Sequence, residues 1–158
     1  MELFEYASGA RMHCGIYVPG QSLNSIISTT FLQKLYIFLK NSQKSYTEMY
    51  IALYNNRVWR LRLVNIGCVN PTTMGILGLS GPVARSCGLM YDERYNRNIS
   101  YGIYNMISMV QYISTTGDSY ARFLIRIREL FESTRIIFVS LGFLHDNNFS
   151  LENLQKLS

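Results

Sequence analysis

Residues 118–141 carry the strongest helical signal in the sequence. Apolar side chains recur there every three or four positions, which places them on one face of an α-helix with about 3.6 residues per turn. Asp118 stands directly before the periodic segment and can cap the first turn, and Gly142 follows it. The pattern predicts one long amphipathic helix, from Asp118 to about Leu141, whose apolar face includes Tyr120, Phe123, Leu124, Ile127, Leu130, Phe131, Ile137 and Phe138.

Charged residues in this segment are spaced for contacts along the helix surface. Arg126 precedes Glu129 by three positions, and Arg128 precedes Glu132 by four. Opposite charges at such spacings meet on one helical face and stabilise a helix by roughly 0.2–0.5 kcal/mol per pair. We therefore expect two ion pairs, Arg126–Glu129 and Arg128–Glu132, that stay within the helix.

Three further segments show helical spacing of apolar residues. They are residues 1–13, 28–40 and 46–54. We expect the second and third to be separate helices joined through residues 41–45.

The rest of the chain is less regular. Asn70-Pro71 predicts the start of a short helix, because Asn caps a helix well and Pro fits its first turn. Residues 80–117 are rich in turn-forming residues and predict an irregular connection, and residues 146–158 predict one short helix. A length of 158 residues suits one domain. We predict a mainly α fold with long irregular loops, a central helical part over residues 1–142 and a polar C-terminal tail over residues 143–158.

The chain has few charges for a soluble domain. Charged residues make up 16% and hydrophobic residues 48%, whereas roughly 25% of the residues in typical globular domains are charged. Such a surface predicts extensive contacts with other proteins. Polar residues interrupt every apolar run before the ~20 residues that a membrane-spanning helix needs, so we expect none.

The net charge of +5 is dispersed along the chain. Arg57, Arg60 and Arg62 form the densest basic group, but no run of Lys and Arg of the kind found in nucleic-acid-binding tails appears. We therefore expect no nucleic-acid partner.

The three cysteines, Cys14, Cys68 and Cys87, are far apart and lack the C-x-x-C spacing of metal sites and redox dithiols. We interpret them as small buried hydrophobic residues in a reducing compartment.

No arrangement typical of an autonomous active site is present in the sequence. The two histidines, His13 and His145, do not accompany a nucleophile motif such as G-x-S-x-G. The carboxylates are scattered, and Gly78-Leu79-Ser80-Gly81 lacks the Gly-Lys-Ser/Thr ending of a phosphate loop. We predict no catalytic residue and no metal ligand on this chain.

Four separated blocks stand out as motifs. They are Ser8-Gly9-Ala10-Arg11-Met12-His13 with Pro19-Gly20; Asn55-Asn56-Arg57-Val58-Trp59-Arg60 with Arg62 and Ile66-Gly67; Gly78-Leu79-Ser80-Gly81 with Arg85, Gly88 and Asp92; and Gly117-Asp118, Tyr120, Arg122, Arg126, Glu129 and Arg135-Ile136-Ile137. In this order and spacing, over about residues 1–140, the chain resembles the quinone-site (49-kDa-type) subunit of respiratory complex I. The resemblance implies the helical central part of a fold like that of the nickel–iron hydrogenase large subunit.

The resemblance begins in the middle of the family's protein. The family's quinone-headgroup His and Tyr would lie upstream, and its carboxyl-terminal third would lie downstream. The resemblance therefore implies a central fragment of a split subunit, completed by other polypeptides. The uncapped helical start at Met1 agrees with missing upstream sequence. The same start lacks the Arg-rich, acid-poor pattern of a transit peptide, so for the mitochondrial location that the resemblance implies we expect an organelle-encoded protein.

In the family, quinone is reduced in a cavity between this subunit and a neighbour that holds the terminal iron–sulfur cluster. The resemblance implies that this chain supplies part of the cavity wall. It indicates Phe4, Arg11, Met12 and His13 as cavity candidates, and the Pro19-Gly20 loop as facing the cluster. Ubiquinone and the neighbour's 4Fe-4S cluster would lie at the interface, and no cofactor would be bound by this chain alone.

The implied partners are other fragments of the same subunit, the neighbour that carries the cluster and further subunits of the peripheral arm. The implied location is the matrix side of the mitochondrial inner membrane, with attachment to the membrane through the complex rather than by a span.

Several positions depart from the family pattern. Val18 and Gln21 flank Pro19-Gly20 where the family usually has Arg-Pro-Gly-Gly, and Leu23 replaces a His thought to sense the redox state of the cluster. Phe4 replaces a Tyr, and Leu63-Val64-Asn65-Ile66-Gly67 replaces Thr-x-Asp-Ile-Gly. The pattern is typical of a divergent member.

Simpler structural roles stay open for the same residues. Arg11 either orients a quinone or a partner carboxylate, or ties two loops together. His13 is more typical of a satisfied interior histidine than of a ligand, Trp59 of a packing anchor, and Asp118 of a helix cap. For the whole chain, the alternatives are an assembly protein that keeps the fold without quinone chemistry, and a basic RNA-binding module of a mitochondrial ribosome.

Overall fold

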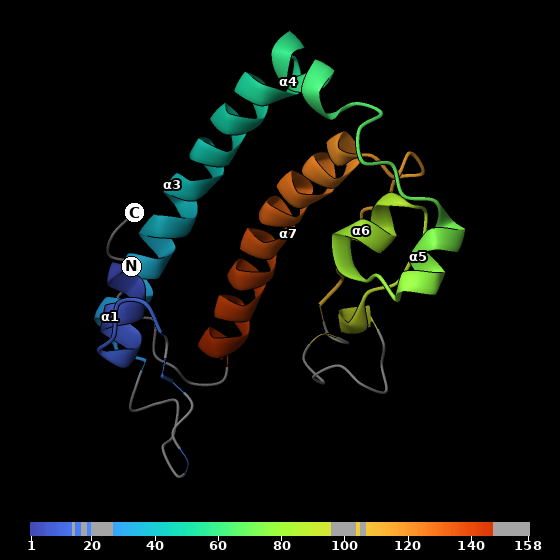
Figure 1. The fold of residues 1–158 in the computed structure, drawn as a ribbon. Helices are drawn as coiled ribbons and strands as arrows, with labels where there is room; N and C mark the ends of the chain where they lie inside the picture. Colours follow the sequence, from blue (N-terminus) through green and yellow to red (C-terminus); the bar gives the residue numbers. More distant parts are fainter. Residues whose placement is uncertain (14, 17–18, 20–26, 96–103, 105–106, 147–158) are drawn as a thin grey trace. The chain divides into compact units, whose positions relative to one another are not determined.

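The computed structural model describes residues 1–13, 15–16, 19, 27–95, 104 and 107–146. Every regular element within them is helical, which confirms the mainly α class (Figure 1). The elements are α1 (Glu2–Ser8), α3 (Thr29–Tyr54), α4 (Arg57–Leu63), α5 (Pro71–Leu77), α6 (Gly81–Ser86), the 3-10 helix η1 (Glu93–Tyr95) and α7 (Ser119–Asp146).

Two compact units divide the chain. Unit 1 takes in Met1–Ser42 and the stretch that begins at Ser140, and unit 2 is Gln43–Val139. The boundaries between the units fall inside α3 and α7, so each long helix contributes to both units. Of the helices in the described ranges, none combines the length and hydropathy needed to cross a membrane.

α3 is one continuous helix of 26 residues, so the prediction of two helices joined through residues 41–45 is wrong. The segment contains neither Gly nor Pro to end the helix. Ser42 within the expected break is buried, and its hydroxyl donates to the Leu39 carbonyl oxygen at 2.8 Å. The polar residues at 41–45 therefore stay helical.

α1 is shorter than the sequence predicts. It ends at Ser8, because Gly9 adopts a left-handed conformation with a φ of 73°. Residues 10–13 follow without helix.

The helix α4 follows α3 in unit 2 and was not predicted from the sequence. Asn56 caps α4: its side-chain oxygen accepts from the backbone N–H groups of Val58 at 3.0 Å and Trp59 at 3.1 Å. The Asn70-Pro71 start is confirmed by α5, which ends at Gly78 with a φ of 60°.

Residues 80–117 are more regular than expected. They contain α6 and η1, and Pro82 lies in the first turn of α6, where its missing N–H is tolerated. Residues 107–118 run without helix, as predicted.

α7 confirms the long helix and its cap. The Asp118 carboxylate accepts from the Ala121 N–H at 2.8 Å. The helix passes through Gly142 to Asp146, beyond the predicted end near Leu141. The short helix expected at residues 146–158 falls outside the described residues, apart from Asp146.

A small core in unit 2 lies between α5 and α6. Met74, Ala84 and Cys87 are buried together, and Val69 and Leu79 pack against them. Cys87 thus confirms the prediction of a buried thiol, whereas Cys68 is exposed, so the prediction for it is wrong. Cys14 lies outside the described residues.

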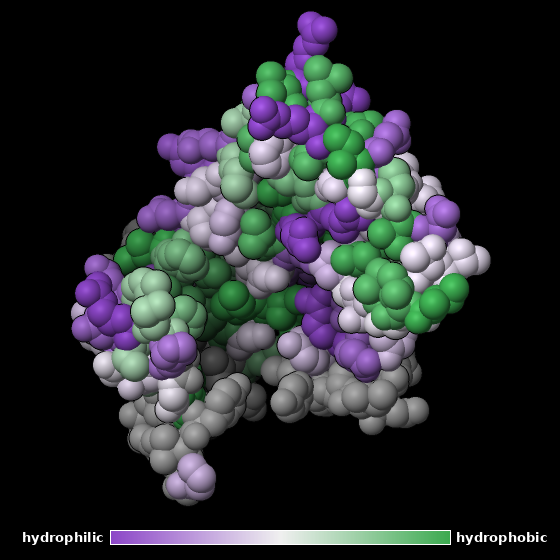
Figure 2. Space-filling view, viewed as in Figure 1, coloured by the Kyte–Doolittle hydropathy of each residue, from purple (hydrophilic) through white to green (hydrophobic). Residues whose placement is uncertain are grey.

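Large apolar side chains also lie on the surface. Figure 2 shows hydrophobic and hydrophilic residues intermixed over α4, where Val58 and Leu61 are exposed. Ile76 and Leu77 are exposed at the end of α5. Exposed apolar surface of this extent is typical of faces that meet other proteins.

Candidate functional site

The segment of unit 1 that includes α1 carries the four predicted cavity residues on its surface. Phe4 is 50% exposed and Met12 is 75% exposed, and His13 is exposed as well. The Ser8 hydroxyl donates to the Phe4 carbonyl oxygen at 2.8 Å, so the end of α1 is tied to the turn that carries Phe4. Phe4 and Met12 therefore present large apolar side chains to their surroundings.

Arg11 forms an ion pair within this segment. Its Nε lies 3.3 Å from Glu5 Oε2, and the two side chains are 67% and 51% exposed. An ion pair this exposed contributes about 0–1 kcal/mol to stability. Arg11 can therefore leave Glu5 for another partner at little cost.

A polar hollow of about 570 Å³ lies beside this ion pair. Lys34 of α3 reaches into it and places its Nζ 3.6 Å from the centre of the Tyr6 ring, a cation–π contact. Of the four predicted cavity residues, Arg11 lines the hollow and Phe4, Met12 and His13 do not. The lining is Glu2, Glu5, Tyr6, Arg11 and Lys34.

Two predictions for this segment change. His13 is exposed, so the interpretation as an interior histidine is wrong. Pro19 is exposed, whereas Gly20, Val18, Gln21 and Leu23 lie outside the described residues. No group of three His, Cys, Asp or Glu side chains that could hold a metal ion occurs in the described part of the chain.

Unit 2 is organised by the buried carboxylate of Asp118. Its Oδ2 accepts from the Asn65 N–H at 3.0 Å, and its Oδ1 accepts from the Ala121 N–H at 2.8 Å and the Thr116 hydroxyl at 3.2 Å. Burial alone would raise the pKa of Asp118, but these hydrogen bonds and the charge of Arg122 hold it below its usual value. The cap therefore joins the Asn65 loop to the start of α7.

Arg122 joins the same two segments from the other side. Its Nη1 donates to the Gly117 carbonyl oxygen at 2.6 Å, and its Nη2 donates to the Gly67 carbonyl oxygen at 2.9 Å and the Ser119 hydroxyl at 2.8 Å. A rigid guanidinium fork suits such a set of acceptors.

Position 117 must be glycine because the backbone of Val69 passes very close to it. Its φ is 65°, and a Cβ built there would lie 2.3 Å from the Val69 carbonyl oxygen. The Gly117 N–H donates to the Ser86 carbonyl oxygen at 2.8 Å, and its own carbonyl accepts from the Val69 N–H at 3.1 Å. Only glycine fits this crossing of chain segments.

A buried ion-pair network lies between α6, η1 and α7. The Arg85 side chain is 7% exposed; its Nη1 lies 3.3 Å from Asp92 Oδ2, and its Nη2 contacts Glu129 Oε1. Arg94 Nη2 lies 2.6 Å from Asp92 Oδ2. Burial alone would raise the pKa of Asp92, but the hydrogen bonds from Arg94 and the charges of Arg94 and Arg85 lower it below its usual value.

This network corrects the predicted pairing along α7. Glu129 pairs with Arg85, 44 positions away, instead of Arg126. Glu132 pairs with Arg135, and it also accepts from the Val110 N–H at 2.9 Å. Arg128 lies over the Tyr112 ring. Neither predicted pair forms: Glu129 binds a distant arginine, and Glu132 pairs along the helix with Arg135 while also fastening the Val110 loop.

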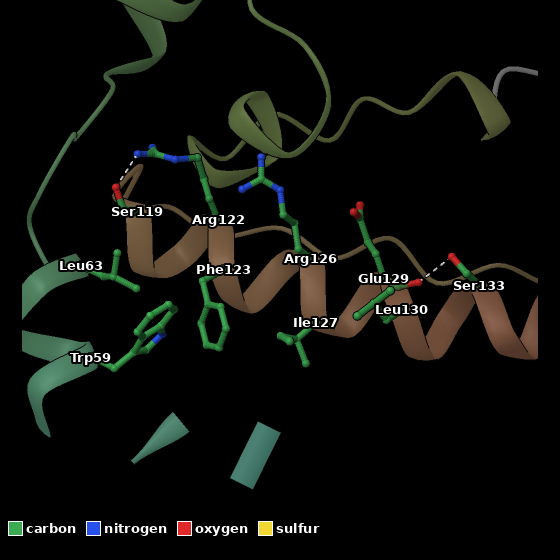
Figure 3. A pocket seen from close by; sticks show the side chains of 10 residues that line it. All are labelled: Trp59, Leu63, Ser119, Arg122, Phe123, Arg126, Ile127, Glu129, Leu130 and Ser133. Carbon is green, nitrogen blue, oxygen red and sulfur yellow. Dashed lines mark hydrogen bonds between the residues drawn. The ribbon is translucent and has the colours of Figure 1, made fainter. Parts of the chain in front are cut away.

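A groove of about 700 Å³ runs along α7 in unit 2 (Figure 3). Trp59 meets Phe123 edge to face, with ring centroids 5.4 Å apart. The hypothesis that Trp59 is a packing anchor fits this contact. The groove is lined by Trp59, Leu63, Ser119, Arg122, Phe123, Arg126, Ile127, Glu129, Leu130 and Ser133.

Sequence reasoning missed the Arg85 network and the groove, although both contain motif residues. Arg85 and Asp92 stand in the third block, and Arg122, Arg126 and Glu129 stand in the fourth. Their shared membership of motifs was the available signal. It did not say which of them meet.

Comparison with known proteins identifies relatives of the whole chain. The family model described as "Respiratory-chain NADH dehydrogenase, 49 Kd subunit" matches residues 1–157. The chain is 54% identical over 141 residues to the NADH-ubiquinone oxidoreductase 49 kDa subunit of Nyctotherus ovalis, covering 89% of this chain and 34% of that protein. The protein of the same name from Paramecium tetraurelia is 36% identical over 137 residues, covering 87% of this chain and 34% of that protein.

A bacterial relative extends the match. The chain is 32% identical over 171 aligned positions to an NADH-quinone oxidoreductase subunit of Alkalilimnicola ehrlichii, covering 93% of this chain and 40% of that protein. The chain thus spans about a third of the length of the two eukaryotic relatives and 40% of the bacterial one.

Proposed function

Because this chain belongs to the family of respiratory-chain NADH dehydrogenase 49 kDa subunits, we propose that it is a central piece of that subunit in mitochondrial NADH:ubiquinone oxidoreductase. In this role it helps to form the quinone-reduction cavity. The chain has no activity by itself and acts as part of the assembled enzyme. It has the helical central part of the hydrogenase-like fold, and other polypeptides complete the subunit.

The observation that carries this proposal is the exposure of a motif segment. Ser8-Gly9-Ala10-Arg11-Met12-His13 lies in the matched range, and Arg11, Met12 and His13 are exposed together with Phe4. A quinone cavity needs apolar and aromatic wall for the ring and tail, and a few polar groups for orientation. Phe4 and Met12 supply the first, and Arg11 supplies the second.

Arg11 acts on the quinone or its neighbours by charge and hydrogen bonding. Its ion pair with Glu5 is exposed, so the guanidinium can turn toward a quinone oxygen or a partner carboxylate without a large loss of stability. Pro19 and Gly20 face the 4Fe-4S cluster of the neighbouring subunit, which delivers the electrons. The quinone-headgroup ligands lie on another polypeptide.

The partners in this proposal are the other fragments of the subunit, the neighbour that bears the cluster and further peripheral-arm subunits. Exposed apolar side chains on α4 and α5 supply contact surface for them. The enzyme lies on the matrix side of the mitochondrial inner membrane, and the chain is organelle-encoded and attached to the membrane through the complex.

Purification of the chain with an affinity tag tests this proposal. We expect the remaining parts of the 49 kDa subunit, a protein with an iron–sulfur cluster and NADH:ubiquinone reductase activity in the same fraction. An assembly protein without quinone chemistry would join the complex only before activity appears and would be absent from the active fraction. Ribosomal RNA in place of these proteins would assign the chain to a ribosome and contradict the proposal.

A further inference from the structure

The groove of unit 2 has the residue spacing of a helix-packing seam. Most of its α7 residues recur at spacings of three or four; they are Ser119, Arg122, Phe123, Arg126, Ile127, Glu129, Leu130 and Ser133. This spacing lines one face of a helix over about four turns, or roughly 20 Å. The lining of a cavity for a compact ligand does not follow one face of a single helix over such a length.

The two edges of the groove differ in chemistry. Figure 3 shows Trp59, Leu63, Phe123 and Ile127 on one side of α7 and the side chains of Arg122 and Arg126 on the other. The apolar edge is partly covered within unit 2, whereas Leu130 and Arg126 in the same lining are exposed. An occupant must therefore be amphipathic.

The charges of the groove favour a carboxylate in that occupant. The Arg122 guanidinium already donates to the carbonyl oxygens of Gly117 and Gly67, and Glu129 already forms an ion pair with Arg85. Arg126 makes no ion pair with any described residue, although a predicted partner stands three positions along the helix. The groove is thus left with one exposed cation at its polar edge.

The apolar edge offers a second unmet group. The Trp59 indole N–H is buried, and no hydrogen-bond acceptor for it occurs among the described residues. Buried indole N–H groups usually find an acceptor.

We propose that the groove is the docking site of an amphipathic helix from another polypeptide, with an apolar stripe toward Phe123, Ile127 and Leu130 and an Asp or Glu toward Arg126. The apolar stripe excludes water from the seam, and the carboxylate fixes its register. Helix-in-groove recognition of this kind reads anchors at spacings of three and four. The proposal concerns a face of unit 2 and does not depend on quinone chemistry.

The first test is cross-linking from the groove in the purified native assembly. Ser133→Cys places a thiol at the groove, and Ser45→Cys places a matched thiol on an exposed part of α3 outside the groove's lining. Both variants carry Cys68→Ser, because the native Cys68 thiol is exposed. A short thiol-directed photo-cross-linker on Cys at 133 should capture one helix of another polypeptide with a carboxylate beside its apolar stripe. The linker on Cys at 45 should not capture that helix.

The second test is a charge exchange. Arg126→Glu should reduce recovery of the chain with the assembly by at least about fivefold, because like charges then face each other across the seam. Lys44→Glu, an exposed charge reversal on α3 outside the groove's lining, should leave recovery within about twofold. Replacing the captured carboxylate by Arg should restore recovery of the Arg126→Glu chain.

Several outcomes would overturn the proposal. They are capture of residues 147–158 of the same chain, capture of a segment without an apolar stripe or a carboxylate, and free alkylation of Cys at 133 in the intact assembly. Protection of that thiol that requires added ubiquinone would assign the groove to a small apolar ligand. Failure of the charge exchange to restore recovery would also contradict it. None of these results bears on the presence of the chain in an active reductase, which the tagged purification measures.

Discussion

Two arginine–glutamate pairs mark two different regions of the molecule. In unit 1, Arg11 pairs with Glu5 at the surface, and the side chains are 67% and 51% exposed. In unit 2, Arg85 pairs with Glu129 and Asp92, and the Arg85 side chain is 7% exposed. An exposed pair contributes about 0–1 kcal/mol, whereas removing one partner of a buried pair costs about 3–5 kcal/mol. Arg85 therefore determines the positions of loops, and Arg11 is free to meet another molecule.

Two glycines repeat this contrast. Gly9 and Gly117 both have positive φ angles, of 73° and 65°. A Cβ at Gly9 would meet nothing within 4 Å, but a Cβ at Gly117 would lie 2.3 Å from Val69 O. Motif residues of unit 2 such as Gly117 and Arg85 are thus explained by packing within the chain. Those of the Ser8–His13 block have few contacts with the other described residues, which is expected when their function lies at a partner.

The largest expected effect follows from Arg85→Met. This change keeps bulk but leaves Glu129, whose side chain is 22% exposed, without its cation, so we expect the free energy of unfolding of unit 2 to fall by about 3 kcal/mol, the lower end of the range for a buried pair. Hydrogen-exchange protection of α6 and α7 amides in the purified assembly measures the loss. Arg85→Met combined with Glu129→Met should lose less than Arg85→Met alone, because no uncompensated charge remains next to α7. Equal protection in the Arg85→Met variant and the native chain would show that the network does not hold these elements.

A smaller effect is expected when alanine replaces the two glycines. Gly117→Ala should cost more than about 2 kcal/mol, because both the backbone and the Val69 carbonyl must move. Gly9→Ala should cost only about 1 kcal/mol, from its backbone conformation alone. Proteolysis of the two variants in the same assembly compares them. A Gly9→Ala chain cleaved as readily as the Gly117→Ala chain would remove the distinction between the regions.

The third effect depends on pH. The pKa of Asp118 is lowered in the folded chain, so its carboxylate stabilises unit 2 above an unfolded-state pKa of about 4. That contribution is lost as the pH falls through the lower folded pKa. Cleavage by pepsin across residues 60–120 should therefore rise in this acid range.

Asp118→Asn is the control for this pH dependence. It should cost about 1 kcal/mol at neutral pH, because the Asn65 N–H then faces an amide. It should also flatten the rise in pepsin cleavage. An unchanged acid profile in this variant would assign the acid sensitivity to other groups.

Local patterns predicted the helices well where all the causes were local. The period of residues 118–141, the Asp118 cap and the Asn70-Pro71 start are properties of adjacent residues, and α7 and α5 confirm them. The α3 break was predicted wrongly because polar residues were taken to end a helix. Ser42 satisfies its hydroxyl within the helix, so no break is required.

Contacts between distant residues could not be predicted in the same way. The partner of Glu129 stands 44 positions away, and spacing along the helix pointed to Arg126 instead. Glu129 pairs with Arg85, which is nearly buried and reaches α7 only through the tertiary fold. The spacing rule for pairs on a helix surface considers only neighbours on the same helix and therefore assigns Glu129 to Arg126. The motif blocks identified the residues of unit 2 that matter, but not what each of them contacts.

The site candidates of unit 1 follow from the family motif, and their exposure is what the structure adds. The motif carried Arg11, Met12 and His13, while the interpretation of His13 as interior failed because α1 ends early at Gly9. When a residue belongs to a site that a partner completes, the sequence around it carries no local pattern that shows its function.

Quinone kinetics of an Arg11→Met variant in the assembled enzyme test the central claim most directly. Electron transfer from NADH to an artificial acceptor should be unchanged, and quinone reductase activity should fall at least about fivefold, or ~1 kcal/mol, because a cavity cation is lost. Glu5→Gln breaks the same ion pair but keeps the Arg11 charge, so its quinone activity should stay near that of the native enzyme. Unchanged quinone kinetics in a fully assembled Arg11→Met enzyme, or an equal loss in Glu5→Gln, would contradict the assignment of Arg11 to the cavity.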